Sequence, residues 1–241
     1  MLPTAMVGYG HRALFVVLGF GIALTCIAAR TLPGSVVDVR SAPDKRVVVS
    51  KTLLALYGSG VVLLNVGLGA LWGFVERIGL HVGLNGQQVG LALSACTVAM
   101  ICGSWFAGWL GDRWGRRLPV LVGVLMCGAA AYAAAASTSS VGYLLALVTY
   151  GFVYLFVGPY IIVGLPSRLD SSGRLAAAAG GTMWLSYSAG LTVGGLLADV
   201  NTLQVIGLLA LVTCLGAAAI FASVMSSAEF TRSSAPRLRP T

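Results

Sequence analysis

Apolar residues fall in seven long blocks that short polar stretches separate. A helix needs about 20 apolar residues to cross a bilayer, and each block approaches that length. The blocks do not alternate apolar and polar residues as the strands of a membrane β-barrel do. The pattern therefore predicts an all-α, polytopic transmembrane helical bundle. Its seven spans are expected at about Arg12–Ala29, Thr52–Val75, Val89–Gly111, Leu118–Ala136, Val141–Val163, Leu175–Ala198 and Leu203–Met225.

The polar stretches divide the chain into four parts. We expect a single transmembrane helix in residues 1–30, a linker in 31–51, a six-helix block in 52–225 and a tail in 226–241. The linker contains Pro33 and Pro43 and is too long for a simple turn between two helices. Residues 27–31 make a poor signal-peptide cleavage site, so we expect the first helix to be retained.

The composition excludes several classes of protein. Hydrophobic residues make up 58% of the 241 residues and charged residues only 9%, whereas soluble domains contain about 25% charged residues. This excludes a soluble enzyme, a disordered chain and a nucleic-acid-binding domain. The five cysteines lie within apolar blocks with no histidine near them, so we expect neither a metal site nor a bound cofactor.

The basic residues are unevenly distributed among the polar stretches. Of the 15 lysine and arginine residues, 13 lie on one side of the predicted bundle, and Arg12 and Arg77 are the exceptions. Because cytoplasmic loops are enriched in lysine and arginine, this places the linker and the C-terminus in the cytoplasm and the N-terminus outside. The 13 residues are Arg30, Arg40, Lys45, Arg46, Lys51, Arg113, Arg116, Arg117, Arg168, Arg174, Arg232, Arg237 and Arg239.

One loop, between the third and fourth blocks, has a specific order of residues. It reads Gly-Trp-Leu-Gly-Asp-Arg-Trp-Gly-Arg-Arg over positions 108–117. We expect a helix to end near Gly111, and Gly115 permits a tight reversal. Asp112 suits the positive end of the next helix, and the arginines can pair with acidic groups or helix C-termini.

This loop resembles the signature of the major facilitator superfamily of secondary transporters, which follows the second helix of a six-helix half. The one-plus-six layout resembles the sixth helix, the central loop and the complete C-terminal half, helices seven to twelve. Two further stretches are similar to bacterial members: residues 71–79 to the end of their seventh helix, and 143–199 to their tenth and eleventh helices. The first five helices of the family have no counterpart.

The resemblance implies a function as well as a fold. It implies secondary active transport of a small solute by alternating access in a bacterial-type inner membrane, as a symporter or antiporter, with no covalent chemistry. The expected partners are the solute, the lipid bilayer and an N-terminal half that the chain lacks. In the family this loop is a conformational latch, a role that the resemblance gives to Gly108, Asp112, Arg113, Gly115, Arg116 and Arg117.

Polar side chains inside spans are costly and are therefore candidates for a transport site. Asn65 lies in the middle of the second block, where it either lines a cavity or bonds to a neighbouring helix. Tyr150 and Tyr154 are four residues apart on one helix face. They either border the transport cavity, as the resemblance implies, or serve only in packing.

Glu76 and Arg77 follow the second block at the end opposite the motif loop. They are either solvated loop charges or an outer gate that controls entry or exchanges a proton. The sequence places no acidic residue deep within a span, so this pair is the candidate that the chain offers for proton exchange.

Three other functions compete with a half transporter. An inactive or regulatory transporter remnant would share the fold, so the sequence leaves it open. A seven-helix receptor or sensor also remains, although a retinal protein is excluded because Lys45 and Lys51 both flank the linker. An intramembrane enzyme lacks the paired aspartates or the spanning histidine that its chemistry needs.

Overall fold

The computed structural model describes residue 20 and residues 50–169, 173–200 and 203–233. The chain divides into two compact units, Met1–Arg46 and Val47–Thr241, and the helices from Lys51 onward all belong to the second. The predicted first span and nearly all of the predicted linker lie outside the described residues.

The described residues of this unit form six long helices. They are α3 (Lys51–Trp72), α5 (Gly86–Leu110), α6 (Arg117–Ala135), α7 (Ser140–Pro159), α9 (Arg174–Val200) and α10 (Leu203–Ser233). Three short segments join them: α4 (Val75–His81), the π-helix η2 (Tyr160–Gly164) and α8 (Pro166–Leu169). No β-strand occurs in the described part of the chain, in agreement with the predicted all-α class.

Among the described residues, five helical segments are long and apolar enough to cross a membrane: α3, α5, α6, α7 with η2, and the first 25 residues of α10. The predicted span at Leu175–Ala198 does form a helix, α9, but Gly, Ser, Thr and Tyr residues dilute its apolar content and it is not among the five. The structure thus supports a helical membrane bundle, while the predicted count of seven spans is only partly supported.

The helix ends differ from the predictions in three places. The block predicted to reach Val75 stops at Trp72, and α4 follows with Val75, Ile78 and Gly79 buried. The helix expected to end near Met225 continues to Ser233. The block predicted to reach Val163 changes after Pro159 from α-helix to the π-helical turn η2.

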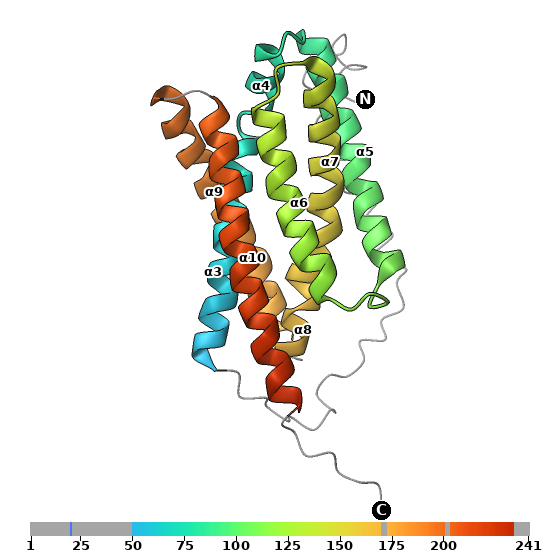
Figure 1. Ribbon diagram of the computed structural model, residues 1–241, viewed down its shortest axis with the longest axis vertical. Coiled ribbons are helices and arrows are strands. Elements are labelled where there is room, and N and C mark those ends of the chain that lie inside the picture. Colours follow the sequence, from blue (N-terminus) through green and yellow to red (C-terminus); the bar gives the residue numbers. More distant parts are fainter. Residues whose placement is uncertain (1–19, 21–49, 170–172, 201–202, 234–241) are drawn as a thin grey trace, which may run out of the picture. The chain divides into compact units, whose positions relative to one another are not determined.

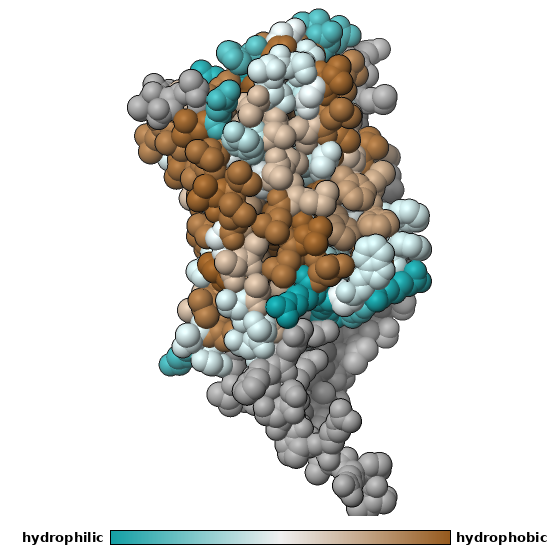
Figure 2. Space-filling model, viewed as in Figure 1, coloured by the Kyte–Doolittle hydropathy of each residue, from teal (hydrophilic) through white to brown (hydrophobic). Residues whose placement is uncertain are grey.

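The six long helices pack as two groups of three. In one group α3 lies between α9 and α10, and in the other α7 lies between α5 and α6, while α6 and α10 join the groups (Figure 1). Apolar side chains such as Ile101, Leu145 and Leu185 are exposed. Figure 2 shows this apolar surface as a belt between two hydrophilic ends, the distribution that a bilayer requires.

Two hydrogen bonds reveal an internal repeat. The Tyr57 hydroxyl of α3 donates to the carbonyl of Ile161 at the end of α7 (2.9 Å), and the Tyr143 hydroxyl of α7 donates to the carbonyl of Val75 after α3 (2.8 Å). The two donors are as far apart in the sequence as the two acceptors. The same separation relates α5 to α9 and α6 to α10. Because α3 and α7 run in opposite directions, the repeat that relates α3, α5 and α6 to α7, α9 and α10 is inverted, and it also relates the two packed groups to each other.

Glycine brings the helices of each group into backbone contact. A Cβ atom on Gly190 of α9 would lie less than 3.0 Å from the Val66 carbonyl of α3, and one on Gly103 of α5 would be as close to the Phe152 carbonyl of α7. Gly194 makes a similar approach to Ala70. The Gly190–Gly194 pair therefore serves close helix packing, as small residues do in membranes.

Candidate functional site

The loop between α5 and α6 is shaped by two glycines. Gly111 ends α5 with a φ of 51°, and Gly115 has a φ of 65°. Side chains with a Cβ atom rarely adopt this left-handed region, so both positions favour glycine. The chain reverses between them, and α6 begins at Arg117 with Pro119 in its first turn, where proline is tolerated. The sequence predicted both the helix end and the reversal.

Arg116 and Asp112 form a bidentate ion pair within this loop. The Arg116 Nε and Nη2 atoms donate to Asp112 Oδ1 and Oδ2 at 2.7 and 2.9 Å. The hydrogen bond to Asp112 raises the pKa of the Arg116 guanidinium, which therefore stays charged. The Asp112 side chain is 61% exposed and that of Arg116 is 21% exposed, so water screens the pair.

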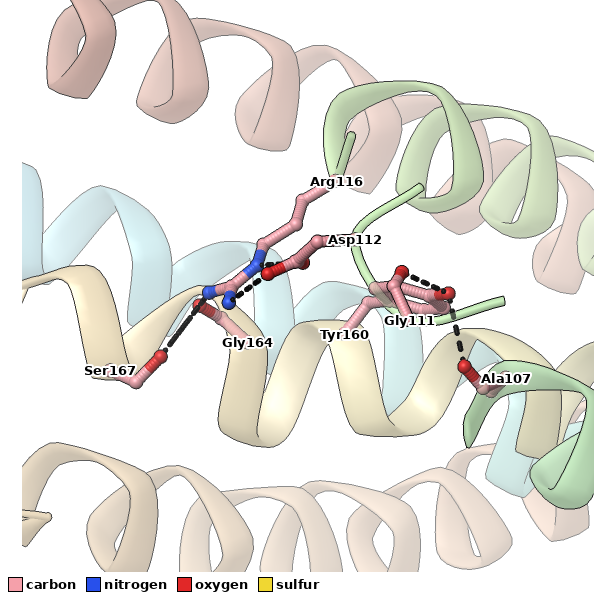
Figure 3. Close-up of polar contacts among 7 residues, drawn as sticks. All are labelled: Ala107, Gly111, Asp112, Arg116, Tyr160, Gly164 and Ser167. Atoms are coloured by element: carbon pink, nitrogen blue, oxygen red, sulfur yellow. Dashed lines mark hydrogen bonds and ion pairs between the residues drawn. The ribbon is translucent and has the colours of Figure 1, made fainter. Parts of the chain in front are cut away.

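Arg116 also reaches the end of α7. Its Nη1 atom donates to the carbonyl oxygen of Gly164 and lies 3.3 Å from Ser167 Oγ. Gly164 is the last residue of η2, where the Leu165 amide bonds to Tyr160 at i−5 (2.8 Å). One guanidinium thus connects the α5–α6 loop to the junction between η2 and α8, as Figure 3 shows.

A second connection runs in the opposite direction. The Tyr160 hydroxyl of η2 lies 2.9 Å from the carbonyl oxygen of Gly111 and 3.2 Å from that of Ala107, at the end of α5 (Figure 3). The Ala107 carbonyl already accepts the Gly111 amide (2.9 Å), whereas Gly111 lies just past the end of α5, where carbonyls lack helical partners and a hydroxyl donor can satisfy them. We call Asp112, Arg116, Tyr160, Gly164 and Ser167 the clamp, because their contacts hold the end of α7 against the loop.

The structure separates the predicted latch residues by role. Asp112 and Arg116 meet, and Gly115 shapes the turn between them. The Arg113 guanidinium instead lies over the Trp109 ring, 5.1 Å from its centroid, in a cation–π contact. Gly108 has open space where a Cβ would be, and Arg117 is the first residue of α6.

Sequence reasoning did not assign Gly164 or Ser167 to this site. Their part in the clamp depends on a backbone carbonyl and a serine some 50 residues from Arg116, for which a sequence gives no local signal. The only indication in the sequence that the end of α7 is unusual is Pro159, because a proline within an apolar block predicts a change in helix geometry.

The predicted transport-cavity residues are buried within the helices. The Asn65 side chain donates to the Val61 carbonyl one turn earlier at 2.8 Å, so its amide is directed to its own helix. The Tyr150 and Tyr154 rings stack with centroids 5.9 Å apart. Tyr150 is fully buried and Tyr154 is partly buried.

The predicted outer-gate residues lie on α4 rather than in a loop. Glu76 and Arg77 are both exposed, and the Arg77 guanidinium lies 5.5 Å from the centroid of the Phe74 ring. No salt bridge joins Glu76 to Arg77 in the part of the chain that the structure describes.

Comparison with known proteins agrees with this arrangement. The family model described as Major Facilitator Superfamily matches residues 58–240, about three quarters of the chain. The match covers α3 from residue 58, every later long helix and the clamp. No individual curated protein matches the chain.

Proposed function

The chain belongs to the major facilitator superfamily, and on that premise we propose that it takes part in secondary active transport of a small solute by alternating access. In this mechanism two helical bundles move about a site near the middle of the membrane and open it to one side at a time. The observation that supports the proposal most directly is the clamp, which joins a loop to the end of a central helix.

The strength of the clamp suits a reversible latch. An exposed ion pair contributes about 0–1 kcal/mol, and the bonds from Arg116 to Gly164 and Ser167 add to it. A contact network with a free energy this small can shift the equilibrium between two conformations by a modest factor and still break in each transport cycle. A buried, fully desolvated pair would hold the helix too firmly. We therefore propose that the clamp closes and opens as the transporter changes state.

The described helices correspond to one six-helix half, and superfamily transporters work with two. We propose that this is the C-terminal half and that transport requires a second six-helix unit. Partial exposure of α5 agrees with this, because it is the least buried of the five apolar spans, with 28% of its apolar window buried. Side chains such as Val98 and Trp105 are exposed on it.

We further propose that the motif end of the bundle faces the cytoplasm of a bacterial-type inner membrane. Lys51, Arg113, Arg116, Arg117 and Arg174 all lie at the ends of helices on this side, and Arg77 is on α4 at the other end. This asymmetry follows the positive-inside rule, and it supports a cytoplasmic C-terminus.

Uptake into lipid vesicles tests the proposal. A panel of labelled small solutes is screened with the chain alone and with a co-expressed N-terminal half, and the solute taken up is then used with variants. We expect Asp112→Asn to reduce uptake about fivefold, which corresponds to a shift of roughly 1 kcal/mol between states, while membrane insertion is unchanged. Lys51→Gln, which also removes one charge at the same end, should transport at the wild-type rate.

Two results would contradict the proposal. Uptake of no solute above the level of empty vesicles, with or without the second half, would argue against transport. Wild-type uptake by Asp112→Asn would leave transport in place but would remove the latch from its mechanism.

A further inference from the structure

The tyrosines within the bundle fall into two groups. Tyr57, Tyr143 and Tyr160 each direct the hydroxyl to a backbone carbonyl near the end of another helix, at 2.8–2.9 Å. This is the usual arrangement of a buried tyrosine, whose ring packs while its hydroxyl satisfies a backbone acceptor. The hydrogen bonds of these three hydroxyls are therefore explained by the fold.

The second group consists of Tyr150, Tyr154 and Tyr187, from α7 and α9. None of these hydroxyls donates to a backbone carbonyl within the described part of the chain. The Tyr150 hydroxyl faces that of Tyr187, yet Tyr150 is fully buried and its hydroxyl has no hydrogen-bond partner of normal length among the described residues. A buried donor without a partner is costly, and its presence needs an explanation.

The rings of this group form one continuous series with two tryptophans. Centroids are 6.3 Å apart for Trp72 and Tyr150, 5.9 Å for Tyr150 and Tyr154, 6.4 Å for Tyr154 and Tyr187, and 6.2 Å for Tyr187 and Trp184. We call these five residues the aromatic series. It runs from α3 across α7 to α9, and its far end is open, because Trp184 is 63% exposed.

We propose that the aromatic series is a binding site for an uncharged, planar solute that carries hydrogen-bond acceptors. Such a solute would stack on the rings, as flat groups do on aromatic side chains, and would accept hydrogen bonds from the tyrosine hydroxyls. The assignment rests on the proposed function, since it names the class of solute that the transporter would recognise.

The surroundings of the series favour an uncharged solute. Among the described residues, the titratable side chains near the Tyr150 hydroxyl are those of Tyr187, Cys127, Tyr154 and Cys96, and no Asp, Glu, His, Lys or Arg side chain is among them. A charged solute would lose its hydration there without gaining an ion pair. The Asn65 amide on α3 is uncharged as well, and it uses one of its two N–H donors within its own helix.

The two groups of tyrosines supply a matched set of variants. Tyr→Phe removes one hydroxyl and leaves the ring. At Tyr150, Tyr154 or Tyr187 it removes a donor that serves no backbone carbonyl, so thermal stability should stay at or above the wild-type value. At Tyr57 or Tyr143 it leaves a buried carbonyl without its donor, so the melting temperature should fall.

The experiment measures binding and stability in the same samples. The full chain in lipid nanodiscs is dialysed against labelled benzamide, which is planar and uncharged, with benzoate and benzyltrimethylammonium as its anionic and cationic counterparts. Empty nanodiscs correct for partition into lipid. We expect saturable binding that is tightest for benzamide and about threefold to tenfold weaker in Tyr150→Phe, the size of effect of one neutral hydrogen bond. Tyr57→Phe should melt earlier but bind benzamide as the wild type does.

Several results would overturn the site. These are the absence of saturable benzamide binding, unchanged affinity in Tyr150→Phe, tighter binding of either charged probe, or a loss of stability in Tyr150→Phe as large as that in Tyr57→Phe. A failure of the proposed transport function would give a different experimental result. In that case the binding pattern would hold while no solute entered vesicles, and the site would then belong to a protein that binds its ligand without transporting it.

Discussion

The two ends of the bundle have the same pair of tyrosine hydrogen bonds but differ in the other contacts that stabilise them. At each end a tyrosine hydroxyl ties one central helix to the end of the other, Tyr57 to Ile161 at the motif end and Tyr143 to Val75 at the opposite end. At the motif end the clamp adds a charged network around Arg116. At the opposite end the added bond is neutral, from Ser140 Oγ to the carbonyl of Val82 at 3.2 Å.

The inverted repeat makes this comparison specific. By the sequence separation that relates Tyr57 to Tyr143, the counterpart of Ser167 in the clamp is His81. No guanidinium bridges to His81 among the described residues; instead it lines a pocket of about 320 Å³. The other lining residues are Val82, Ala135, Ser137, Thr138, Leu203 and Gln204. The repeat thus supplies a symmetric scaffold, and among the described residues the two ends differ in the ion-paired network around Arg116, which the motif end has.

Substitution of the two crossing glycines tests the shared scaffold and has the largest expected effect. Gly103→Ala and Gly190→Ala each place a Cβ against a backbone carbonyl, which must force the helices apart. We expect each to lower the free energy of unfolding by about 2 kcal/mol, in the range of overpacked cores. Unfolding of the purified chain in detergent by a graded denaturant measures the effect.

Gly195→Ala is the control for the glycine substitutions, because no atom lies within 4 Å of its Cβ position. It should leave the stability unchanged or raise it slightly. If Gly103→Ala and Gly190→Ala lower the free energy of unfolding by amounts that differ severalfold, the two three-helix groups are not equivalent. The comparison between the ends would then lose its basis.

Replacement of Arg116 by lysine tests the difference between the ends and has a smaller expected effect. Lysine keeps the charge but cannot hold Asp112 with two parallel bonds while it reaches Gly164. We expect global stability to change by less than about 1 kcal/mol, whereas the Leu165 amide, which closes the π-helical turn, should exchange its hydrogen about fivefold faster.

Hydrogen exchange followed by mass spectrometry measures this effect. His81→Ala, a change at the opposite end at the counterpart of Ser167, should leave exchange at Leu165 as it is in the wild type. Equal exchange at Leu165 in Arg116→Lys and wild type would mean that the clamp does not hold the end of α7.

The sequence predicted those features of the fold that depend on local pattern. Apolar blocks located the long helices, and glycine spacing located the turn after α5, because both follow from residues adjacent in the chain. The short helix α4 was missed because Glu76 and Arg77 suggested a loop, while the burial of Val75 and Ile78 that supports the helix depends on tertiary packing.

The contacts of the site were harder to predict, because they too depend on tertiary packing between distant parts of the sequence. The order of residues in the motif identified Asp112 and Arg116, but the bond from Arg116 to Gly164 joins residues 48 positions apart. Tyr150 and Tyr154 were selected from their spacing. Their difference from Tyr57 and Tyr143 lies only in where each hydroxyl points, which the spacing of tyrosines in a sequence does not indicate.

The central claim is that the charged network at the motif end holds the end of α7 in one of two positions. The distance between spin labels at positions 114 and 163 tests it most directly, because Trp114 and Val163 are exposed on the two sides of the clamp. Labels would be attached to cysteines in a chain whose native cysteines have been replaced. We predict one dominant short distance with the clamp intact and a second, longer population in Asp112→Asn. An unchanged single distance in Asp112→Asn would contradict the account.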